Sequence, residues 1–596
     1  MIEFLNQPLP SKRRGGWKMR RAAEALRKPN RTRSKLAERQ LGKWCDGHIT
    51  TPNLVQVCRD AIEDGLAQPI LFRLGCLASK SLSFRANLSK KTPRLREVMA
   101  VLQNESVSKF IIAVPGSEIK CFLKPSMLMQ YIISNFPKKF KVIFGANRAK
   151  LAEFWEGLLS SPFGRELGSL NPMVGGKTLQ ELSNCIPICL HEDAGPYAKG
   201  HSMNIINFSS LLARGPQEST KFIITSHIKT AEEKPNSESL AKFWAEIIAD
   251  FDELAASDKL VDPSDGGDQW RVILLFGKGD MEMRVQTWGL PGWQHAIDVC
   301  PNCMANRAER PYTDNRQSAG WRPTSLQSMP NSFFMDRLAQ PRHPLTLSKY
   351  FHKWFAILDV MHVMDCKGVT SHVAGGVLRY LIVNEERLGR NQDMRLANLN
   401  LKMDKFQTKN KTPSRMPPFR ENNFISSDGW YQLSGQLIKA ANTRHLVPWL
   451  VEVVEEYFDK PTKFDRAVVS LVQNLQVMYQ ILYSAGTFLK PEELTNLNSC
   501  VLKFGIRYQF LREHFKANNE YFFNFVHKVH AMQHLPEIAS FINPRMLQCY
   551  AEEGAVGRIA QIWKASKHGP YRKRVQEVVL TKLLIRMHLG LTGIMK

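Results

Sequence analysis

Two cysteines and two histidines stand at the spacings of zinc ligands in this chain of 596 residues. Cys300 and Cys303 form a Cys-x-x-Cys pair, in which two thiolates can hold one metal ion. A redox dithiol is the competing interpretation, although no thioredoxin-like βαβ pattern surrounds the pair. His530 and His534 are four residues apart on an expected helix, so their imidazoles face the same side, and a surface or packed-core role is the alternative for them. Together the four residues predict a zinc site that joins two distant parts of the chain.

Three acidic positions stand near the ends of expected elements. Asp193 follows an apolar run and precedes a Gly-Pro turn, Asp280 follows a second apolar run, and Glu553 comes after the histidine pair. Carboxylates held at such ends can bind Mg²⁺ or Mn²⁺, which prefer oxygen ligands. The competing interpretation of Asp193 is a simple turn former. Glu192 competes with Asp193, and Glu552 competes with Glu553.

The elements that must position these residues divide into an α/β part and a helical part. Apolar runs predict strands at 186–190, 202–208, 221–226 and 270–276, with strands of a smaller module at 109–114 and 140–144. Helical spacing of apolar residues predicts helices at 237–256, 437–458, 466–484 and 491–515, with a break or a start at Pro448. Prolines and lysines predict a mobile loop at 402–420.

The charge of the chain favours a polyanionic partner. Lys and Arg number 81 against 55 Asp and Glu, so the net charge is +26, which favours nucleic acid over an anionic membrane surface. No run of 18 apolar residues predicts a membrane span. An odd count of 11 cysteines argues against a disulfide framework and favours a reducing compartment.

Much of this charge lies in the first 45 residues. Thirteen Lys or Arg stand between Lys12 and Lys43, opposed only by Glu24 and Glu38. Such an arm can be a nuclear-import signal, a phosphate-binding arm or both, with a merely solvated tail as the alternative. The residues predicted to contact DNA are Lys12, Arg13, Arg14, Arg20, Arg21, Arg31 and Arg33.

The order of these motifs resembles that of the DDE transposases of the CACTA-like group, and more distantly that of the catalytic subunit of the V(D)J recombinase. The two Asp, the Cys pair, the His pair and the Glu follow one another, with a helical block between the Cys and His pairs. Asp359 and His362 are similar to the family's Asp-x-x-His block. Tyr550, Glu553 and Gly557 match its Tyr-x-x-Glu-x-x-x-Gly segment, which favours Glu553 over Glu552. The likeness spans about residues 185–565.

The resemblance implies an α/β plus α fold class, in which a large, mainly helical insertion interrupts an RNase H-like catalytic core. In this core two Asp lie on neighbouring strands and a Glu lies on a later helix. The expected parts are a basic flexible arm at 1–45, a small module of unassigned role at 46–180, the first part of the core at 181–300, the helical insertion at 301–525 and closing helices at 526–596.

The implied activity is metal-dependent hydrolysis of phosphodiester bonds, followed by strand transfer, at DNA ends in the nucleus. Asp193, Asp280 and Glu553 would hold two Mg²⁺ or Mn²⁺ ions. The Cys and His pairs would hold a structural Zn²⁺, whose affinity should weaken at low pH because protons compete for the ligands. Three roles stay open for Asp359 and His362: contact with target DNA, support of the active site, or orientation of a helix.

DNA is therefore the expected partner, with no membrane and no small-molecule cofactor. Transposases commonly act as dimers, so a homodimer is one expectation. Two other functions stay open. One is a domesticated or decayed relic that binds DNA without cutting it, and the other is a basic helical scaffold for RNA or chromatin, in which the three carboxylates do not converge.

Overall fold

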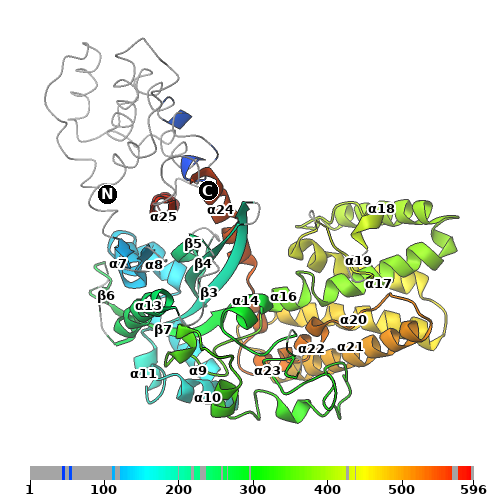
Figure 1. Cartoon of the computed structure of the whole chain (residues 1–596), viewed down its shortest axis with the longest axis horizontal. Coiled ribbons are helices and arrows are strands. Elements are labelled where there is room, and N and C mark those ends of the chain that lie inside the picture. Colours follow the sequence, from blue (N-terminus) through cyan, green and yellow to red (C-terminus); the bar gives the residue numbers. More distant parts are fainter. Residues whose placement is uncertain are drawn as a thin grey trace. The chain divides into compact units, whose positions relative to one another are not determined.

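The computed structural model of the chain has a mixed α/β fold (Figure 1). It describes residues 43–46, 48, 53–54, 56, 110–114, 121–198, 201–215, 220–228, 237–256, 259–264, 266–293, 295, 297–424, 429–435, 438–566 and 575–591. The chain divides into two compact units. Unit 1 comprises residues 1–146, 185–273 and 552–596, and unit 2 comprises residues 147–184 and 274–551. Residues 147–184 fall within the small module expected from the sequence, yet they belong to unit 2.

Unit 1 is built on a five-stranded sheet in the order β5–β4–β3–β7–β6. The pairs β3–β4, β4–β5 and β6–β7 are antiparallel. The strands are β3 (Cys185–Ala198), β4 (His201–Ser210), β5 (Phe222–Ile228), β6 (Leu260–Val261) and β7 (Gln269–Lys278), whose last residues belong to unit 2. A separate antiparallel pair consists of β1 (Ile111–Ala113) and β2 (Cys121–Leu123).

Helices pack on both faces of this sheet. They are α7 (Pro125–Asn135), α8 (Pro137–Phe144), α13 (Glu238–Ala256), α24 (Tyr550–Ser566) and α25 (Val575–Leu591). Phe251 of α13 packs on Phe208 of β4, with ring centroids 6.3 Å apart. On the opposite face, Trp563 of α24 donates a hydrogen bond from Nε1 to Ser226 Oγ of β5 at 2.7 Å. The apolar side chains of the sheet are therefore enclosed between α13 and α24.

The structure changes two strand predictions in unit 1. Residues 140–144 form the end of α8 instead of a strand, because Pro137 begins a helix and Gly145, with φ of +65°, ends it. The strand predicted at 186–190 exists, but it continues to Ala198. Asp193 therefore lies inside a strand, whereas the sequence places it after one. The strand predicted at 109–114 is present at Ile111–Ala113, and the strand predicted at 270–276 and the helix predicted at 237–256 are confirmed.

Unit 2 is mainly helical. Its shorter helices are α9 (Arg148–Ser160), α10 (Pro162–Leu170), α11 (Leu179–Leu182), α14 (Met281–Gln286), α15 (Asn331–Asp336), α16 (Val360–Met364), α22 (His527–Met532) and α23 (Leu535–Ala539). Its long helices are α17 (Val369–Asn384), α18 (Gln392–Lys409), α19 (Ala440–Tyr457), α20 (Lys463–Ser484) and α21 (Pro491–Ala517). Single 3₁₀ turns lie at η3 (Arg322–Thr324), η4 (Pro344–Leu347), η5 (Glu386–Leu388), η6 (Glu421–Asn423) and η7 (Pro544–Leu547). Helices α20 and α21 pack along each other (Figure 1).

Two predictions for unit 2 are wrong in part. The predicted loop at 402–420 begins eight residues too early, because α18 continues to Lys409 with Leu399, Met403 and Gln407 buried along one face. The Gln407 side chain donates a hydrogen bond to the carbonyl oxygen of Met416 and accepts one from its N–H. These bonds tie the segment around Met416 to α18. Pro448 lies inside α19 and neither ends nor begins it. In the part of the chain that the structure describes, no helix combines the length and the hydropathy needed to span a membrane.

Candidate functional site

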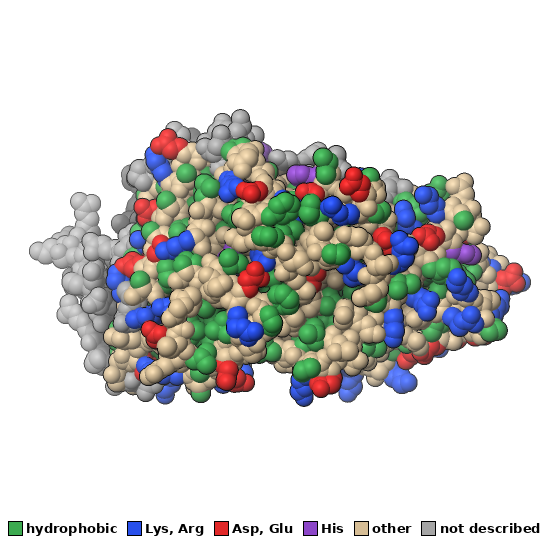
Figure 2. Space-filling view, turned by 90° about the horizontal axis from the view of Figure 1, so that it is seen from below, with side chains coloured by type: hydrophobic (Ala, Val, Ile, Leu, Met, Phe, Trp, Pro, Cys, Tyr) green, Lys and Arg blue, Asp and Glu red, His purple; other side chains and the backbone are tan. Residues whose placement is uncertain are grey.

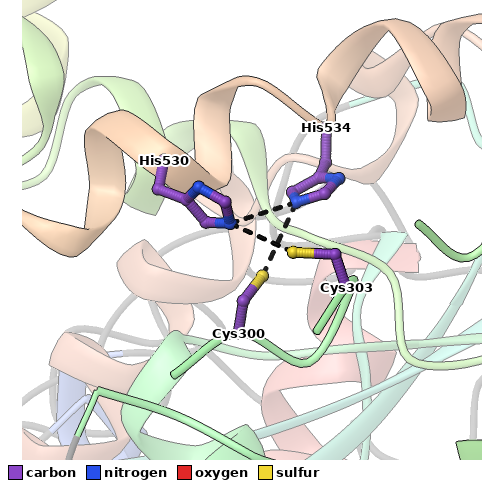
Figure 3. A group of neighbouring side chains, drawn as sticks. All are labelled: Cys300, Cys303, His530 and His534. Carbon is purple, nitrogen blue, oxygen red and sulfur yellow. Dashed lines mark hydrogen bonds between the residues drawn. The ribbon is translucent and has the colours of Figure 1, made fainter. Parts of the chain in front are cut away.

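Cys300, Cys303, His530 and His534 lie together in unit 2, although Cys303 and His530 are 227 positions apart in the sequence (Figure 3). One sulfur or nitrogen atom of each residue lies within 4.8 Å of the other three. Cys300 Sγ is 3.6 Å from His534 Nε2, Cys303 Sγ is 3.3 Å from His530 Nε2, and the two Nε2 atoms are 3.4 Å apart. Usual zinc bond lengths give a tetrahedron with edges of about 3.5 Å between sulfur and nitrogen and about 3.3 Å between nitrogens. The group could therefore bind a metal such as zinc.

The cysteine pair is oriented by its own loop. The backbone N–H groups of Asn302 and Ala305 donate to Cys300 Sγ and Cys303 Sγ, each at 3.4 Å. Arg337 donates from Nη2 to the carbonyl oxygens of both cysteines, at 2.8 and 2.9 Å. Both cysteines are fully buried. This burial beside two imidazoles favours metal binding over the redox interpretation, because a redox dithiol must be reached by its partner.

The histidine pair lies where α22 ends and α23 begins. His530 belongs to α22, and His534 is the residue before α23, so the single helix predicted for both is in fact two short ones. The spacing of four residues still brings both Nε2 atoms to one point. His534 Nδ1 is 3.1 Å from Glu537 Oε1, a contact of the kind that orients metal-binding histidines. Trp321 packs against both imidazoles, with centroids 4.6 and 5.3 Å away.

The electrostatics of the group favour the thiolate at Cys300, whereas burial and the neighbouring Cys300 raise the pKa of the Cys303 thiol well above its ordinary value. Burial opposes ionisation of Cys300, but a hydrogen bond with Cys303 and the charges of His534 and His530 lower the pKa of its thiol well below the ordinary value. Burial also opposes a charged His534, yet Glu537 and Cys300 raise the pKa of this imidazole to about 10. A metal ion would replace the imidazolium proton as the positive partner of the thiolate, which is the form of cysteine that binds zinc.

His527, the third histidine of the segment, is outside the group. Burial lowers its pKa to about 4, so it is a neutral core histidine, with its ring 6.1 Å from that of His530. Among the described residues, the Cys and His pairs form the one set of three or more Cys, His, Asp or Glu side chains close enough to share an ion.

Asp193 is buried within β3, and one of its carboxylate oxygens accepts the N–H of Ala194 at 2.7 Å. Successive side chains of a strand point to opposite faces, so Asp193 and Glu192 lie on different sides of the sheet. Gly195, on the same face as Asp193, lies so close to α24 that a Cβ atom there would be 2.8 Å from Val556 Cγ1. Asp193 is therefore on the face that α24 covers, and Glu192 is on the other.

Helix α24 carries both candidate glutamates near its beginning. Glu552 is fully buried, and Lys221 donates to its Oε1 at 2.6 Å and to Ser209 Oγ at 3.0 Å. Glu553 is only partly buried. Neighbouring helical residues point about 100° apart, so the two carboxylates face different surroundings. Glu552 is therefore engaged in a buried ion pair.

Asp280 follows β7 in unit 2 and caps α14, where its Oδ1 accepts the N–H of Met283 at 2.6 Å. Two buried cations lie within electrostatic reach. Burial lowers the pKa of both Arg284 and Lys528, and the charges of Asp280 and Asp359 are among those that oppose this effect. The surroundings of Asp280 are thus basic.

Asp359 and His362 form a buried pair at α16. Asp359 Oδ2 is 2.5 Å from His362 Nδ1, and its Oδ1 accepts the N–H of Met361 at 2.9 Å. Asp359 therefore caps α16, which is the helix-orienting role among those left open by the sequence. Burial disfavours the carboxylate, but the hydrogen bond and the charge of His362 lower the pKa of Asp359 below its ordinary value.

The structure brings the four predicted zinc ligands together, but it does not show the three carboxylates as one site. Asp193 and Glu553 belong to unit 1 and Asp280 belongs to unit 2, so the convergence of the triad stays a prediction. The predicted DNA contacts of the arm, Lys12, Arg13, Arg14, Arg20, Arg21, Arg31 and Arg33, lie outside the described residues.

Sequence reasoning missed a second buried carboxylate in unit 2. Asp365 accepts hydrogen bonds from the hydroxyls of Tyr479 and Tyr550, and burial raises its pKa to about 7. Its position three residues after His362 was a weak local signal. Nothing local indicated that tyrosines 114 and 185 residues further along the chain meet there. Glu537, by contrast, stands three residues after His534, a helical spacing that the sequence does reveal.

The chemistry of these residues rests on their own geometry, without support from a relative of known function. No protein-family model matches the chain, and a search of curated proteins finds no significant match.

Proposed function

We propose that the chain is a transposase-like enzyme that hydrolyses phosphodiester bonds at DNA ends and transfers the freed strand. The observation that carries this proposal is the meeting of Cys300 and Cys303 with His530 and His534. The resemblance to DDE transposases predicts this pairing across a helical block, and the pairing depends on how the chain between Cys303 and His530, which are 227 positions apart, folds. A basic RNA or chromatin scaffold gives no reason for it.

The positions of the acidic residues along the strands and on α24 add support. Strands β3 and β7 are neighbours in the sheet, Asp193 lies in β3, and Asp280 follows β7 by two residues. The proposed RNase H-like core requires two Asp on neighbouring strands. Glu553 lies on α24, which covers the face of the sheet that carries Asp193. The sheet face favours Asp193 over Glu192 as a ligand, and the match of Tyr550, Glu553 and Gly557 to the family's segment favours Glu553 over Glu552.

Zinc bound by the Cys and His pairs would be structural. It would join the loop that follows β7 to the α22–α23 segment, and all four ligands are buried, so no position is open to a substrate. Glu537 would hold the His534 ring in the orientation that binds.

The acidic residues would serve the phosphodiester chemistry. Two Mg²⁺ or Mn²⁺ ions, when bound, activate the attacking oxygen and stabilise the leaving oxygen of an in-line displacement. Asp193, Asp280 and Glu553 supply the anionic oxygens that such ions need. Water attacks the phosphorus and the bond to the 3′ oxygen breaks; the freed 3′-hydroxyl then attacks a second phosphodiester. This scheme needs no nucleophilic Ser or Tyr.

DNA in the nucleus is the proposed partner, with a homodimer as the expected working state. The net charge of +26 favours a polyanion. On the face shown in Figure 2, the basic side chains of the described residues are spread among acidic and apolar ones instead of forming one continuous patch. The proposal therefore assigns much of the DNA affinity to the basic arm at 12–43.

The test is nicking of supercoiled plasmid by the purified full-length chain, with and without Mg²⁺. Asp280→Asn keeps the oxygen that caps α14 but removes the charge, so we expect loss of cleavage with DNA binding retained. Asp393→Asn makes the same chemical change at an exposed residue in the first turn of α18 and should leave cleavage intact. Equal cleavage by wild type and Asp280→Asn would refute the assignment; binding without any cleavage would favour the decayed relic.

A further inference from the structure

We propose that Asp365 is a positioning residue which, together with Asp359, fixes the first turn of α24 and thereby the carboxylate of Glu553. This inference rests on the proposed function, because it assigns a task to a buried network through the third acidic ligand. The network lies within unit 2, which includes Tyr550 and Ala551 at the beginning of α24.

The two aspartates stand at the two ends of α16. Asp359 precedes this five-residue helix and Asp365 follows it. Asp359 Oδ1 accepts the backbone N–H of Cys549 at 3.1 Å, and Asp365 Oδ2 accepts the hydroxyl of Tyr550 at 2.5 Å. The two aspartates that flank α16 therefore bind two consecutive residues: Asp359 binds Cys549, just before α24, and Asp365 binds Tyr550, the first residue of α24.

The partners of this contact are themselves held firmly. Asp365 is 2 % exposed, and its other oxygen accepts the hydroxyl of Tyr479 on α20. The Tyr479 hydroxyl also lies 2.7 Å from Thr370 Oγ1 on α17. The guanidinium of Arg444 lies 4.8 Å from the centroid of the Tyr550 ring, a cation–π contact that fixes the aromatic part of the same side chain.

Asp365 does not have the geometry of a metal ligand itself. Both of its oxygens already accept phenol hydrogens in a buried setting, and a hard cation would have to displace them. Its effect must therefore pass through the residues that it binds. One of them, Tyr550, is the first residue of α24, the helix that carries Glu553.

Glu553 is three residues after Tyr550, which is less than one helical turn, or about 4.5 Å along the axis. A shift of the first turn is therefore transmitted almost undiminished to the Glu553 carboxylate. Mg²⁺ demands oxygen ligands at about 2.0–2.1 Å in near-octahedral geometry, so small displacements matter. The hydrogen bonds from Cys549 to Asp359 and from Tyr550 to Asp365, here called the clamp, would supply that precision.

Two tyrosine variants isolate the clamp. Tyr550→Phe and Tyr479→Phe each remove one hydroxyl from the same carboxylate, but only Tyr550 belongs to α24. We expect Tyr550→Phe to lower kcat of Mg²⁺-dependent plasmid nicking by about tenfold or more, the range of a displaced reactive group, with KM for DNA unchanged. Tyr479→Phe should lower kcat by at most about threefold, although it should lose at least as much thermal stability as Tyr550→Phe, because its hydroxyl contacts both Asp365 and Thr370.

Hydrogen exchange separates this inference from the proposed function. Amides of residues 552–556 should exchange faster in Tyr550→Phe than in wild type, and should be unchanged in Tyr479→Phe. If wild type does not nick DNA but this exchange pattern appears, the proposed function fails and the clamp on α24 stands. Equal exchange in the two variants, or equal kcat in two folded variants of an active enzyme, would overturn the positioning role.

Discussion

Replacing Cys300 by Ser should remove zinc from the protein and destabilise unit 2. The hydroxyl of Ser is a poor zinc ligand compared with a thiolate, and the remaining three ligands do not complete the tetrahedron. The loss should reach beyond the cysteine loop, because the same ion would bind His530 and His534 of the α22–α23 segment.

The magnitude follows from the separation of the ligands along the chain. Cys300 and His534 are 234 residues apart, so the unfolded chain does not present the complete site and zinc stabilises the folded state selectively. At free zinc 1,000-fold above Kd, this linkage is worth about 4 kcal/mol. Its loss corresponds to a fall in Tm of roughly 5–15 °C for a unit of this size.

The assay measures zinc per chain by atomic absorption after dialysis, together with Tm by calorimetry. We expect one zinc ion per wild-type chain, and less than a tenth of that for Cys300→Ser. Cys500→Ser is the matched control, because Cys500 lies on α21 outside the metal-binding group. Equal zinc content and equal Tm in Cys300→Ser and Cys500→Ser would refute the assignment of the site.

Three further predictions concern stability. Lys221→Ala should cost about 3–5 kcal/mol in the free energy of unfolding measured with denaturant, because it removes the cation that is paired with the buried carboxylate of Glu552. Gly195→Ala should cost about 1–3 kcal/mol by the same measurement, because the new Cβ would lie 2.8 Å from Val556 Cγ1. Burial lowers the pKa of His343 to about 3, below its unfolded value of about 6.5, so its contribution to stability is complete above pH 6.5 and is lost as pH falls toward 3. His343→Asn keeps an acceptor for the Leu345 N–H and should remove about 1.4 kcal/mol per pH unit of that dependence, measured by denaturation at several pH values.

Controls of the same chemistry accompany these variants. Lys242→Ala breaks an exposed i,i+4 pair with Glu238 and should change stability little. Gly557→Ala adds a Cβ in the same helix as Val556 but meets no atom within 4 Å, so it should stabilise α24 slightly. Comparable losses in Lys221→Ala and Lys242→Ala, or in Gly195→Ala and Gly557→Ala, would contradict the burial argument.

The metal group could be predicted from sequence because each half of it is local. The spacings Cys300–Cys303 and His530–His534 both suggest two ligands on one side of a short segment, and the helical block between them explains how the halves can meet. The remote partners of Asp365 could not be predicted, because Tyr479 and Tyr550 carry no spacing that links them to residue 365. Their meeting depends on how α16, α20 and α24 pack.

The strand and loop errors have similar causes. Residues 140–144 are apolar enough for a strand, and only Pro137 and Gly145 at the two ends reveal a helix. The polar composition of 402–409 suggests a loop, but buried Met403 and Gln407 at a spacing of four continue α18. The strand beginning near residue 186 continues past its apolar run, because the alternate residues Asp193, Gly195 and Tyr197 are buried instead of ending the strand at the surface.

The most direct test of the central claim is Mg²⁺-dependent DNA strand cleavage by charge-neutral variants of the glutamates on α24. Glu553→Gln and Glu552→Gln make the same change at neighbouring residues, and only Glu553 is assigned to the metal ions. The transposase account predicts that wild type and Glu552→Gln nick plasmid DNA, whereas Glu553→Gln binds DNA without nicking it. Nicking that survives in Glu553→Gln would contradict the account.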